Sequence, residues 1–554
     1  MLKRILKFLA WTFGILLLLL AGLLLYVRQV GRMEPPVVVP TPLSTAPIQQ
    51  PDPGLYTLGN NWFRQSESGL YELYVEGTPY ERGVANGRLT QALVQYQEDV
   101  FTGQINKFVP NGFYLGMLKY MVGWFNRDLD KLVPQEYQQE IYGVSQAASS
   151  IHDDIAPAYQ RILNYHGAHD IGHALQNMSL VGCTAFATWG HQSADSTLIV
   201  GRNFDFYVGD EFARDKIVAF YAPEKGHKFM MLTFGGMTGV VSGMNDAGLT
   251  VTINAAKSDV PGAAATPVSL VAREILQYAS TISEAYSLAA RRKMFVSESF
   301  LIGSAHDNRA ALIEKTPDAM DLYEPDREYI ISTNHFLGEK LGRTELNEEH
   351  MRTSASPYRF SRVEELLVQK ASGPNTVERT AAILRDQRGL DNKAIGLGNE
   401  KLVNQLVAHH AVIFEPAKQR VWVSTAPWQL GKFVCYDLKK IFAQRPTRND
   451  ELYEEALTIP ADSFLLTQDY RDYVKFHRYR FPFAPRTDLN PDSVVRWNPL
   501  SYHAYMLAGD QCLERGQYEQ AAHFYEKGLT LETATVQERE HMEKNLQRCK
   551  EKML

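Results

Sequence analysis

An uncharged apolar stretch near the N-terminus restricts most strongly how this chain can fold. It runs from Phe8 to Val27 and holds twenty residues without Asp, Glu, Lys or Arg. As a helix with a rise of ~1.5 Å per residue, about twenty such residues cross the ~30 Å hydrocarbon layer of a membrane. Residues 1–32 are therefore predicted to form a transmembrane anchor.

Basic residues flank this stretch unequally. Lys3, Arg4 and Lys7 precede it together with the terminal amine. Arg28 and Arg32 follow it. This excess predicts a cytoplasmic N-terminus, with the rest of the chain on the outer (periplasmic or extracytoplasmic) side. A cleaved signal peptide is the competing interpretation. Its apolar region is normally about 7–15 residues long and ends at a small-residue cleavage site, which this sequence lacks.

The composition excludes several classes of protein. Hydrophobic residues make up 45% and charged residues 22%, which excludes a mostly disordered chain. The net charge of −6 argues against a general nucleic-acid binder, because neutralising phosphates requires a basic surface. Four cysteines without a CxxC pair provide neither a disulfide scaffold nor a structural zinc site. No phosphate-binding or dinucleotide-binding glycine motif is present, so no cofactor is expected.

The remaining chain divides by pattern. Seven prolines in residues 33–54 predict a stiff, extended linker. Residues 55–182 show mostly helical spacing of apolar residues after a short strand at Leu70–Glu76. Residues 183–445 alternate as strands, then helices, then strands again. This order predicts an α+β core of antiparallel sheets covered by helices, rather than a doubly wound parallel sheet.

The last two segments carry weaker signals. Residues 446–500 form a connecting segment without an assigned role. In residues 501–554, small and aromatic residues such as Gly509, Ala521 and Tyr525 follow the spacing of one tetratricopeptide-like helical hairpin. Stable arrays of such repeats usually need three or more copies. A hairpin packed on the main domain is therefore favoured, and a protein partner at this segment stays an alternative.

Cys183 is the candidate nucleophile. Gly182 precedes it, and a glycine carbonyl is sterically open to attack by the cysteine sulfur. The change from helical to strand patterning also falls on this cysteine. The next predicted strand carries Arg202 and Asp205. Antiparallel pairing of these two neighbouring strands would bring both residues close to Cys183.

A histidine-rich stretch lies just upstream of this cysteine. His166, His169, Asp170 and His173 follow a spacing that places them on one helix face. Such a face can bind zinc, but the HExxH arrangement is absent. A solvated or capping role is therefore favoured over a metal site.

The order of these motifs resembles a known family. Gly-Cys-Thr at 182–184, followed by Gly-Arg-Asn-Phe-Asp-Phe at 201–206, is similar to the N-terminal-nucleophile cysteine hydrolases of the acyl-coenzyme A:6-aminopenicillanic acid acyltransferase family. The choloylglycine (bile salt and penicillin V) hydrolases are more distant relatives. The resemblance extends from about Tyr71 to Ser424 and includes the stretch GTPYERG at 77–83. It implies an αββα four-layer sandwich and a precursor that cuts itself before the cysteine.

The resemblance also implies roles for single residues. After self-cleavage, the new α-amine of Cys183 would act as the base for its own thiol. Asp205 would hold that amine, and Arg202 would favour the thiolate. Asn254, which follows the GMNDAGL hairpin, and Asn334 would donate to the oxyanion. Arg359 resembles the last arginine of the family, with Arg362 as the alternative.

These observations predict a membrane-anchored amidohydrolase that cleaves a linear, non-peptide acyl amide through a thioester on Cys183. The anchor favours a lipid-like or envelope-derived substrate. Two alternatives stay open. One is an acyltransferase that passes the acyl group to an amine. The other is a membrane-tethered interaction protein with an inactive core, which would use residues 501–554 as its docking surface.

Overall fold

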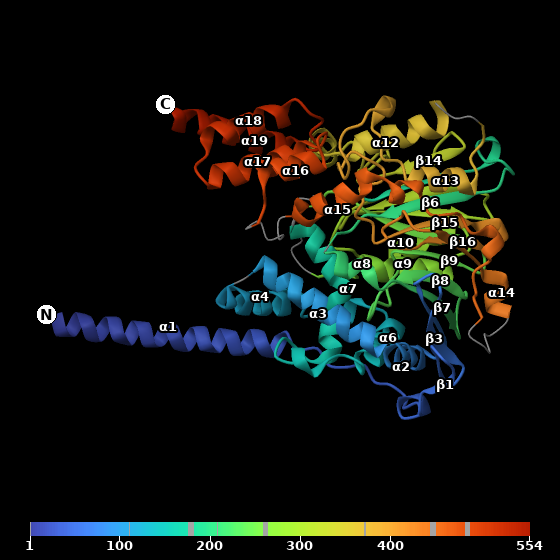
Figure 1. Ribbon diagram of the computed structural model, residues 1–554. Helices are drawn as coiled ribbons and strands as arrows, with labels where there is room; N and C mark the ends of the chain where they lie inside the picture. Colours follow the sequence, from blue (N-terminus) through green and yellow to red (C-terminus); the bar gives the residue numbers. More distant parts are fainter. Residues whose placement is uncertain are drawn as a thin grey trace.

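The protein folds as an α+β body with one long helix projecting from it (Figure 1). The computed structural model describes residues 2–109, 111–175, 182–207, 209–258, 264–369, 373–443, 450–481 and 488–554. The α-helices are α1 (Leu2–Val30), α2 (Pro79–Leu89), α3 (Gln91–Phe108), α4 (Gly112–Phe125), α5 (Leu129–Leu132), α6 (Gln135–Ser145), α7 (Ala158–Leu175), α8 (Asp210–Arg214), α9 (Val268–Tyr278), α10 (Ile282–Arg291), α11 (Glu345–Thr353), α12 (Ser356–Glu364), α13 (Val377–Leu384), α14 (Leu438–Ala443), α15 (Gln468–Arg480), α16 (Pro491–Trp497), α17 (Tyr502–Glu514), α18 (Tyr518–Leu529) and α19 (Val536–Met553).

Two β-sheets form the centre of the body. The larger sheet has the spatial order β1 (Gln49–Asp52), β2 (Leu55–Leu58), β3 (Asn61–Gln65), β4 (Tyr71–Gly77), β7 (Ile217–Pro223), β8 (Phe229–Thr233), β9 (Ser242–Asn245), β10 (Leu249–Ala255), β11 (Glu298–Ser304), β12 (Arg309–Lys315) and β13 (Met320–Tyr323). The smaller sheet has the order β14 (Tyr329–Ser332), β5 (Thr184–Thr188), β6 (Ile199–Phe204), β15 (His410–Glu415), β16 (Arg420–Ser424) and β17 (Phe433–Asp437).

The pairing corrects three expectations from the sequence. Strands β4 and β7 pair in parallel, so the larger sheet is not antiparallel throughout. Residues 55–182 are mostly helical in their described part, as expected, but they contain three strands rather than one, because β2, β3 and β4 continue the sheet of the core. The proline-rich linker is also shorter than residues 33–54, because β1 at its end pairs with β2.

The two sheets pack face to face, and helices lie on their outer faces. Val200 and Phe414 of the smaller sheet share one buried cluster with Phe220 and Leu312 of the larger sheet. A second cluster joins the outer face of the larger sheet to α9 and α10, and a third joins the smaller sheet to α12 and α13. Burial of this apolar surface, at about 25 cal/mol per Å², holds the layers together.

Strand periodicity decides which residues reach the space between the sheets. Along β10, Val251 and Ile253 belong to the cluster under the helices. Successive side chains of a strand point to opposite faces, so Thr252 and Asn254 point toward the smaller sheet. The Nδ2 atom of Asn254 accordingly donates to the backbone carbonyl of Ser332 on β14, at 3.0 Å.

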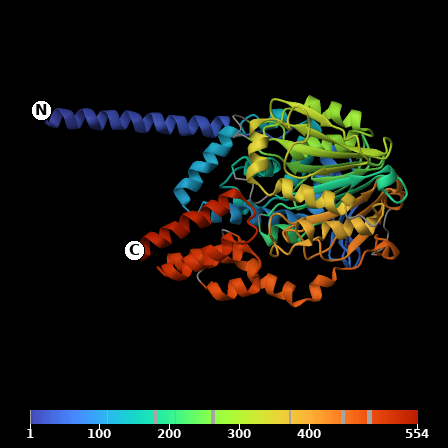
Figure 2. The ribbon, with the colours of Figure 1, turned by 90° about the horizontal axis from the view of Figure 1, so that it is seen from above.

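Helix α1 projects away from the body in both views (Figures 1 and 2). Its segment Lys3–Val27 is long and apolar enough to cross a membrane and is not buried by the rest of the protein. Helix α4 packs against its base, with 6.2 Å between the ring centroids of Tyr26 and Trp124. Helix α4 exposes Phe113 and Met121 to solvent.

The GTPYERG stretch ties α2 into the body. Thr78 and Glu81 form a capping box at the start of α2, and Pro79 occupies its first turn. Gly83 lies so close to the backbone carbonyl of Glu140 on α6 that any side chain at this position would overlap with it. This stretch therefore sets how closely α2 and α6 can approach one another.

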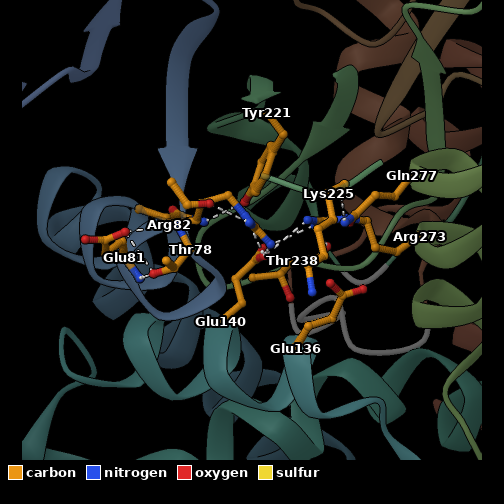
Figure 3. Close-up of polar contacts among 12 residues, drawn as sticks. Thr78, Glu81, Arg82, Glu136, Glu140, Tyr221, Lys225, Thr238, Arg273 and Gln277 are labelled. Carbon is orange, nitrogen blue, oxygen red and sulfur yellow. Dashed lines mark hydrogen bonds and ion pairs between the residues drawn. The ribbon is translucent and has the colours of Figure 1, made fainter. Parts of the chain in front are cut away.

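A buried charge network joins α2, α6 and α9 (Figure 3). Glu140 Oε2 accepts from Arg82 Nη2 at 2.8 Å and from Arg273 Nη2 at 3.1 Å. The Nη1 atoms of the two arginines also donate to backbone carbonyls, that of Arg82 to Gly77 at 2.8 Å and that of Arg273 to Thr238 at 2.8 Å. All three charged side chains are buried. The network therefore connects the segment before Cys183 to the segment after it.

Replacing Glu140 with glutamine should destabilise the fold by about 3–5 kcal/mol, because two buried guanidinium groups would lose their counter-charge. Denaturant unfolding of the full chain measures the change. Glu136→Gln on the same helix is the matched control, because Glu136 is only partly buried and accepts from the Tyr278 hydroxyl. Equal losses in the two variants would contradict this role for Glu140.

The C-terminal helices pack onto a loop of the core. Asn399 Nδ2 donates to the Glu532 carbonyl at 2.8 Å, and Lys401 Nζ lies 2.6 Å from the Glu532 carboxylate. Residues 501–554 form three helices, α17, α18 and α19, where two were expected. The segment expected to be a simple connection, 446–500, contains α15 and α16, and α15 reaches the site described next.

Candidate active site

Cys183 lies immediately before β5, beside β6, which carries the predicted Arg202 and is followed directly by the predicted Asp205. The register of β5 and β6 places Ala185 opposite Arg202, which confirms the expected antiparallel pairing. Arg202 Nη2 lies 3.8 Å from Cys183 Sγ. The backbone carbonyl of Asp205 lies 4.0 Å from the same sulfur and accepts from the Gly182 N–H at 2.9 Å.

The Arg202 guanidinium is fixed on several sides. It donates to the carbonyl of Val241 at 2.9 Å, and to Ser242 Oγ and the carbonyl of Ile253. Its central carbon lies 4.3 Å from the centroid of the Phe204 ring. His410 Nε2 is 2.8 Å from the same Ser242 hydroxyl. A rigid, buried cation therefore lies beside the thiol.

Burial nevertheless dominates the acidity of the thiol. It raises the pKa of Cys183 to about 11, although the nearby Arg202 acts in the opposite direction. Arg202 thus favours the thiolate, as expected, but does not outweigh desolvation in the uncleaved chain. The thiol is protonated at neutral pH, and its attack on a carbonyl requires a base.

Asp205 has the properties of such a base. Burial raises the pKa of its carboxyl group to about 7, opposed by Arg359 and Arg202. Its Oδ2 atom lies 3.5 Å from Gln405 Nε2. Its Oδ1 atom is buried and has no hydrogen-bond partner within the part of the chain that the structure describes. A group with a pKa near the working pH both accepts and releases a proton readily.

The two predicted oxyanion asparagines lie at the site with their amide donors already engaged. Asn254 Nδ2 donates to the Ser332 carbonyl at 3.0 Å and to the Ser332 hydroxyl at 3.2 Å. Asn334 Nδ2 donates to the Ala255 carbonyl at 2.9 Å. Both side chains are buried. These contacts connect β10 with β14.

Arg359 reaches the site, and its alternative Arg362 does not. Arg359 Nη2 donates to Asn334 Oδ1 at 2.5 Å, and its charge opposes the rise in the pKa of Asp205. Arg362 instead pairs with Glu365 and Asp386, each at 2.8 Å. The structure therefore brings all six predicted residues together, with Arg359 in the last place.

Sequence reasoning missed two buried residues beside the cysteine. Gln405 Nε2 donates to the carbonyl of Gly182 at 2.6 Å. Glu298 is fully buried, and burial raises the pKa of its carboxyl group well above the usual range. Both are too far from Cys183 in sequence, and too far from any motif, to be found from a pattern.

The histidine-rich stretch is built into the core in its described part. His166 is buried, with Nε2 2.9 Å from Thr238 Oγ1. Asp170 Oδ2 accepts from the N–H of Val268 at 2.9 Å and so caps α9. Neither residue is solvated. The side chains of His169 and His173 lie outside the described residues. Among the described residues, no group of His, Cys, Asp and Glu has an arrangement that would hold a metal.

Residues 192–427 match the family model of the acyl-coenzyme A:6-aminopenicillanic acid acyl-transferases. The family resemblance is thereby confirmed. The matched family is described as one of acyl-transferases, which is one of the two expected classes of enzyme. The acyl-transferase match includes five of the predicted site residues and begins just after Cys183.

Two curated proteins are similar to about half of the chain. An uncharacterised protein of Archaeoglobus fulgidus is 24% identical over 279 residues, which is 47% of this chain and 46% of that protein. Protein dcd1B of Dictyostelium discoideum is 20% identical over 273 residues, which is 46% of this chain and 52% of that protein. The chain thus spans about half the length of the curated relatives that it matches.

Two solved structures are similar to a comparable share of this chain. The Caenorhabditis elegans orthologue of N-acylethanolamine-hydrolyzing acid amidase has a TM-score of 0.31 and 17% identity, over 42% of this chain and 93% of that chain. A mutant of the conjugated bile acid hydrolase from Clostridium perfringens has a TM-score of 0.32 and 14% identity, over 47% of this chain and 93% of that chain.

Proposed function

We propose that the protein is a membrane-anchored amidohydrolase with an N-terminal-nucleophile sandwich fold. It cuts its own chain between Gly182 and Cys183, and then cleaves a linear, non-peptide acyl amide through a thioester on Cys183. One observation carries the proposal. The thiol of Cys183 lies 3.8 Å from a fixed arginine and 4.0 Å from the backbone carbonyl of Asp205, and it directly follows a glycine carbonyl that is already hydrogen-bonded.

The self-cleavage begins with attack by the thiol. Cys183 Sγ bonds to the Gly182 carbonyl carbon while Asp205 accepts the thiol proton, and the electron pair of the C=O bond moves to oxygen. The C–N bond then breaks, and the nitrogen takes the proton back from Asp205. The product is a thioester of Gly182. Water hydrolyses it, which releases the Gly182 carboxylate, restores the thiol and leaves a free α-amine on Cys183.

The same residues then serve substrate turnover. The α-amine, with a pKa of about 7.7–8.0, takes the thiol proton as Cys183 attacks the substrate amide. The amine product leaves with that proton, and water hydrolyses the acyl thioester. Arg202 stabilises the negative charge on sulfur. Asp205 holds the α-ammonium group by a charge-assisted hydrogen bond.

The membrane part of the proposal rests on α1 and α4. Helix α1 has the length and composition of a membrane span. The apolar residues Phe113, Met121 and Trp124 of α4 are exposed beside the base of α1. Aromatic residues at such a place are typical of a membrane–water interface. The excess of basic residues before the apolar stretch from Phe8 to Val27 favours a catalytic body outside the cytoplasm. This position favours a lipid-like acyl amide.

Acyl transfer to an amine is the second candidate, favoured by the description of the matched family. A panel of linear acyl amides, incubated with and without amine acceptors, separates the two reactions. Hydrolysis gives free acid at a rate that does not depend on the acceptor, whereas transfer gives a new amide that increases with it. An intact chain that cleaves no amide would instead support a tethered interaction protein that uses residues 501–554.

A further inference from the structure

The carbonyl that self-cleavage would attack already has a side-chain donor. Gln405 Nε2 lies 2.6 Å from the Gly182 carbonyl oxygen, and both residues are buried. Gln405 comes from the loop before β15, 223 residues away in sequence. A buried donor at this distance needs no rearrangement to follow the oxygen as its charge develops.

We propose that Gln405 is the catalytic oxyanion donor of the self-cleavage, a role separate from that of the two predicted asparagines. This inference rests on the proposed self-cleavage. When Cys183 Sγ adds to the Gly182 carbonyl carbon, the oxygen becomes an oxyanion, and the Gln405 amide donates to it. This hydrogen bond strengthens as the negative charge on the oxygen grows, because the buried surroundings exclude water.

The asparagines are already engaged in the uncleaved chain. The amide groups of Asn254 and Asn334 donate to Ser332 and Ala255, so neither is free for the Gly182 oxygen. The self-cleavage and the later substrate turnover would therefore use different donors. Gln405 acts on the chain's own carbonyl, whereas the asparagines would have to release Ser332 and Ala255 before they donate to an acyl group that enters later.

The residue before the cysteine must be small for this contact to exist. A Cβ atom at Gly182 would overlap with the amide of Gln405. The glycine thus admits the donor to its own carbonyl, besides leaving the carbonyl open to the sulfur. The same Nε2 atom lies 3.5 Å from Asp205 Oδ2, so the amide also connects the reacting carbonyl with the base.

Arg480 is a positioning residue for this donor. Its Nη1 atom donates to the backbone carbonyl of Gln405 at 2.9 Å and lies 3.2 Å from the Tyr473 hydroxyl. Both Arg480 and Tyr473 are buried on α15. The segment after the core thereby holds the loop that carries Gln405, which gives α15 a place in maturation of the protein.

The test compares rates of self-cleavage in the full chain. Freshly synthesised wild type, Gln405→Met and Gln405→Asn are sampled over time and analysed by intact-mass spectrometry. Methionine keeps the volume without a donor, and asparagine keeps the donor but shortens its reach. We expect both variants to cleave roughly 10²–10³-fold more slowly than wild type, the loss typical of one oxyanion donor. Gln429→Met, at an equally buried glutamine bonded to the Leu384 carbonyl, should cleave at the wild-type rate.

The outcomes separate this inference from the proposed function. If wild type cleaves, Cys183→Ala does not, and both Gln405 variants stay within about threefold of wild type, the role of Gln405 is wrong while the self-cleavage stands. If wild type itself stays intact, both the proposed self-cleavage and this inference are wrong. Melting temperatures show whether slow cleavage reflects misfolding. The Gln405→Asn variant decides the matter if Gln405→Met does not fold.

The role of Arg480 has its own readout. Arg480→Lys retains a donor for the Gln405 carbonyl and should restore most of the cleavage rate that Arg480→Met loses. Equal slowing in both variants, at equal melting temperature, would contradict positioning through this hydrogen bond.

Discussion

Replacing Cys183 with alanine is expected to leave a single intact chain, whereas wild type is cut into one fragment that ends at Gly182 and one that begins at Cys183. In the proposed mechanism the sulfur forms the first new bond to the Gly182 carbonyl carbon, so its removal stops the reaction at the first step. Turnover of acyl amides should also fall at least ~10³-fold, because no thioester can form. A denaturing gel and N-terminal sequencing of both fragments measure the first effect.

Cys435 provides the matched control. It is buried in β17 and belongs to the cluster between the smaller sheet and its helices, away from Gly182. Cys435→Ala should therefore cleave as wild type does. Cleavage at residue 182 in the Cys183→Ala chain would mean that an outside protease makes the cut, and the mechanism would lose its nucleophile.

The two fragments should stay together after the cut. The first fragment supplies β1 to β4 of the larger sheet, and β4 pairs along its whole length with β7 of the second fragment. The Glu140 network also spans the cut, between Arg82 and Arg273. Separating the fragments would break a sheet in its interior and expose its buried faces, so the fragments would separate only on unfolding.

Local patterns predicted the elements better than their partners. Alternation and turn residues located β5, β6 and β10, and the short motifs brought Arg202, Asp205 and Asn254 to one site. The parallel pairing of β4 with β7 was not predictable, because the two strands lie far apart in the sequence, on either side of the proposed cut. Nothing in the alternation of a single strand specifies which distant strand it joins.

The missed residues of the site have a related cause. Gln405 and Glu298 act through burial and through contacts with residues far away in sequence, and neither lies in a recognisable motif. Burial also outweighed the expected effect of Arg202 on the pKa of the Cys183 thiol. The sequence indicated that Arg202 lies nearby, but not that desolvation would raise the pKa of the thiol more than the arginine lowers it. The need for a base followed only from the structure.

The self-cleavage rate is expected to rise with pH and to level off above about pH 7. Asp205 must be ionised to accept the thiol proton, and its carboxyl group has a pKa of about 7 in the folded chain. Asp205→Asn removes this base. Its cleavage rate should fall roughly 10²–10⁴-fold, and the step near pH 7 should disappear. Rates measured between pH 5 and 9 for both chains test this. The same step in the Asp205→Asn chain would assign the base to another group.

The same carboxyl group should lower the stability of the uncleaved fold at high pH. Its folded-state pKa of about 7 exceeds the unfolded value of 3.8, so the unfolded chain loses this proton first as the pH rises. The stability that the protonated Asp205 carboxyl group contributes is fully present below pH 3.8 and is lost progressively up to about pH 7. The difference corresponds to an upper bound of about 4 kcal/mol.

Asp205→Asn should remove this loss, because the asparagine side chain does not ionise. Other buried carboxyl groups, such as Glu400 with a pKa of about 8, remain in both chains and cancel in the comparison. To keep both chains uncleaved, the unfolding experiments use the Cys183→Ala background. Between pH 5 and pH 8, the chain that retains Asp205 should lose more stability than the chain that carries Asp205→Asn. Parallel curves for the two chains would show that Asp205 is already ionised at pH 5, and it would then lack the raised pKa that suits a proton carrier.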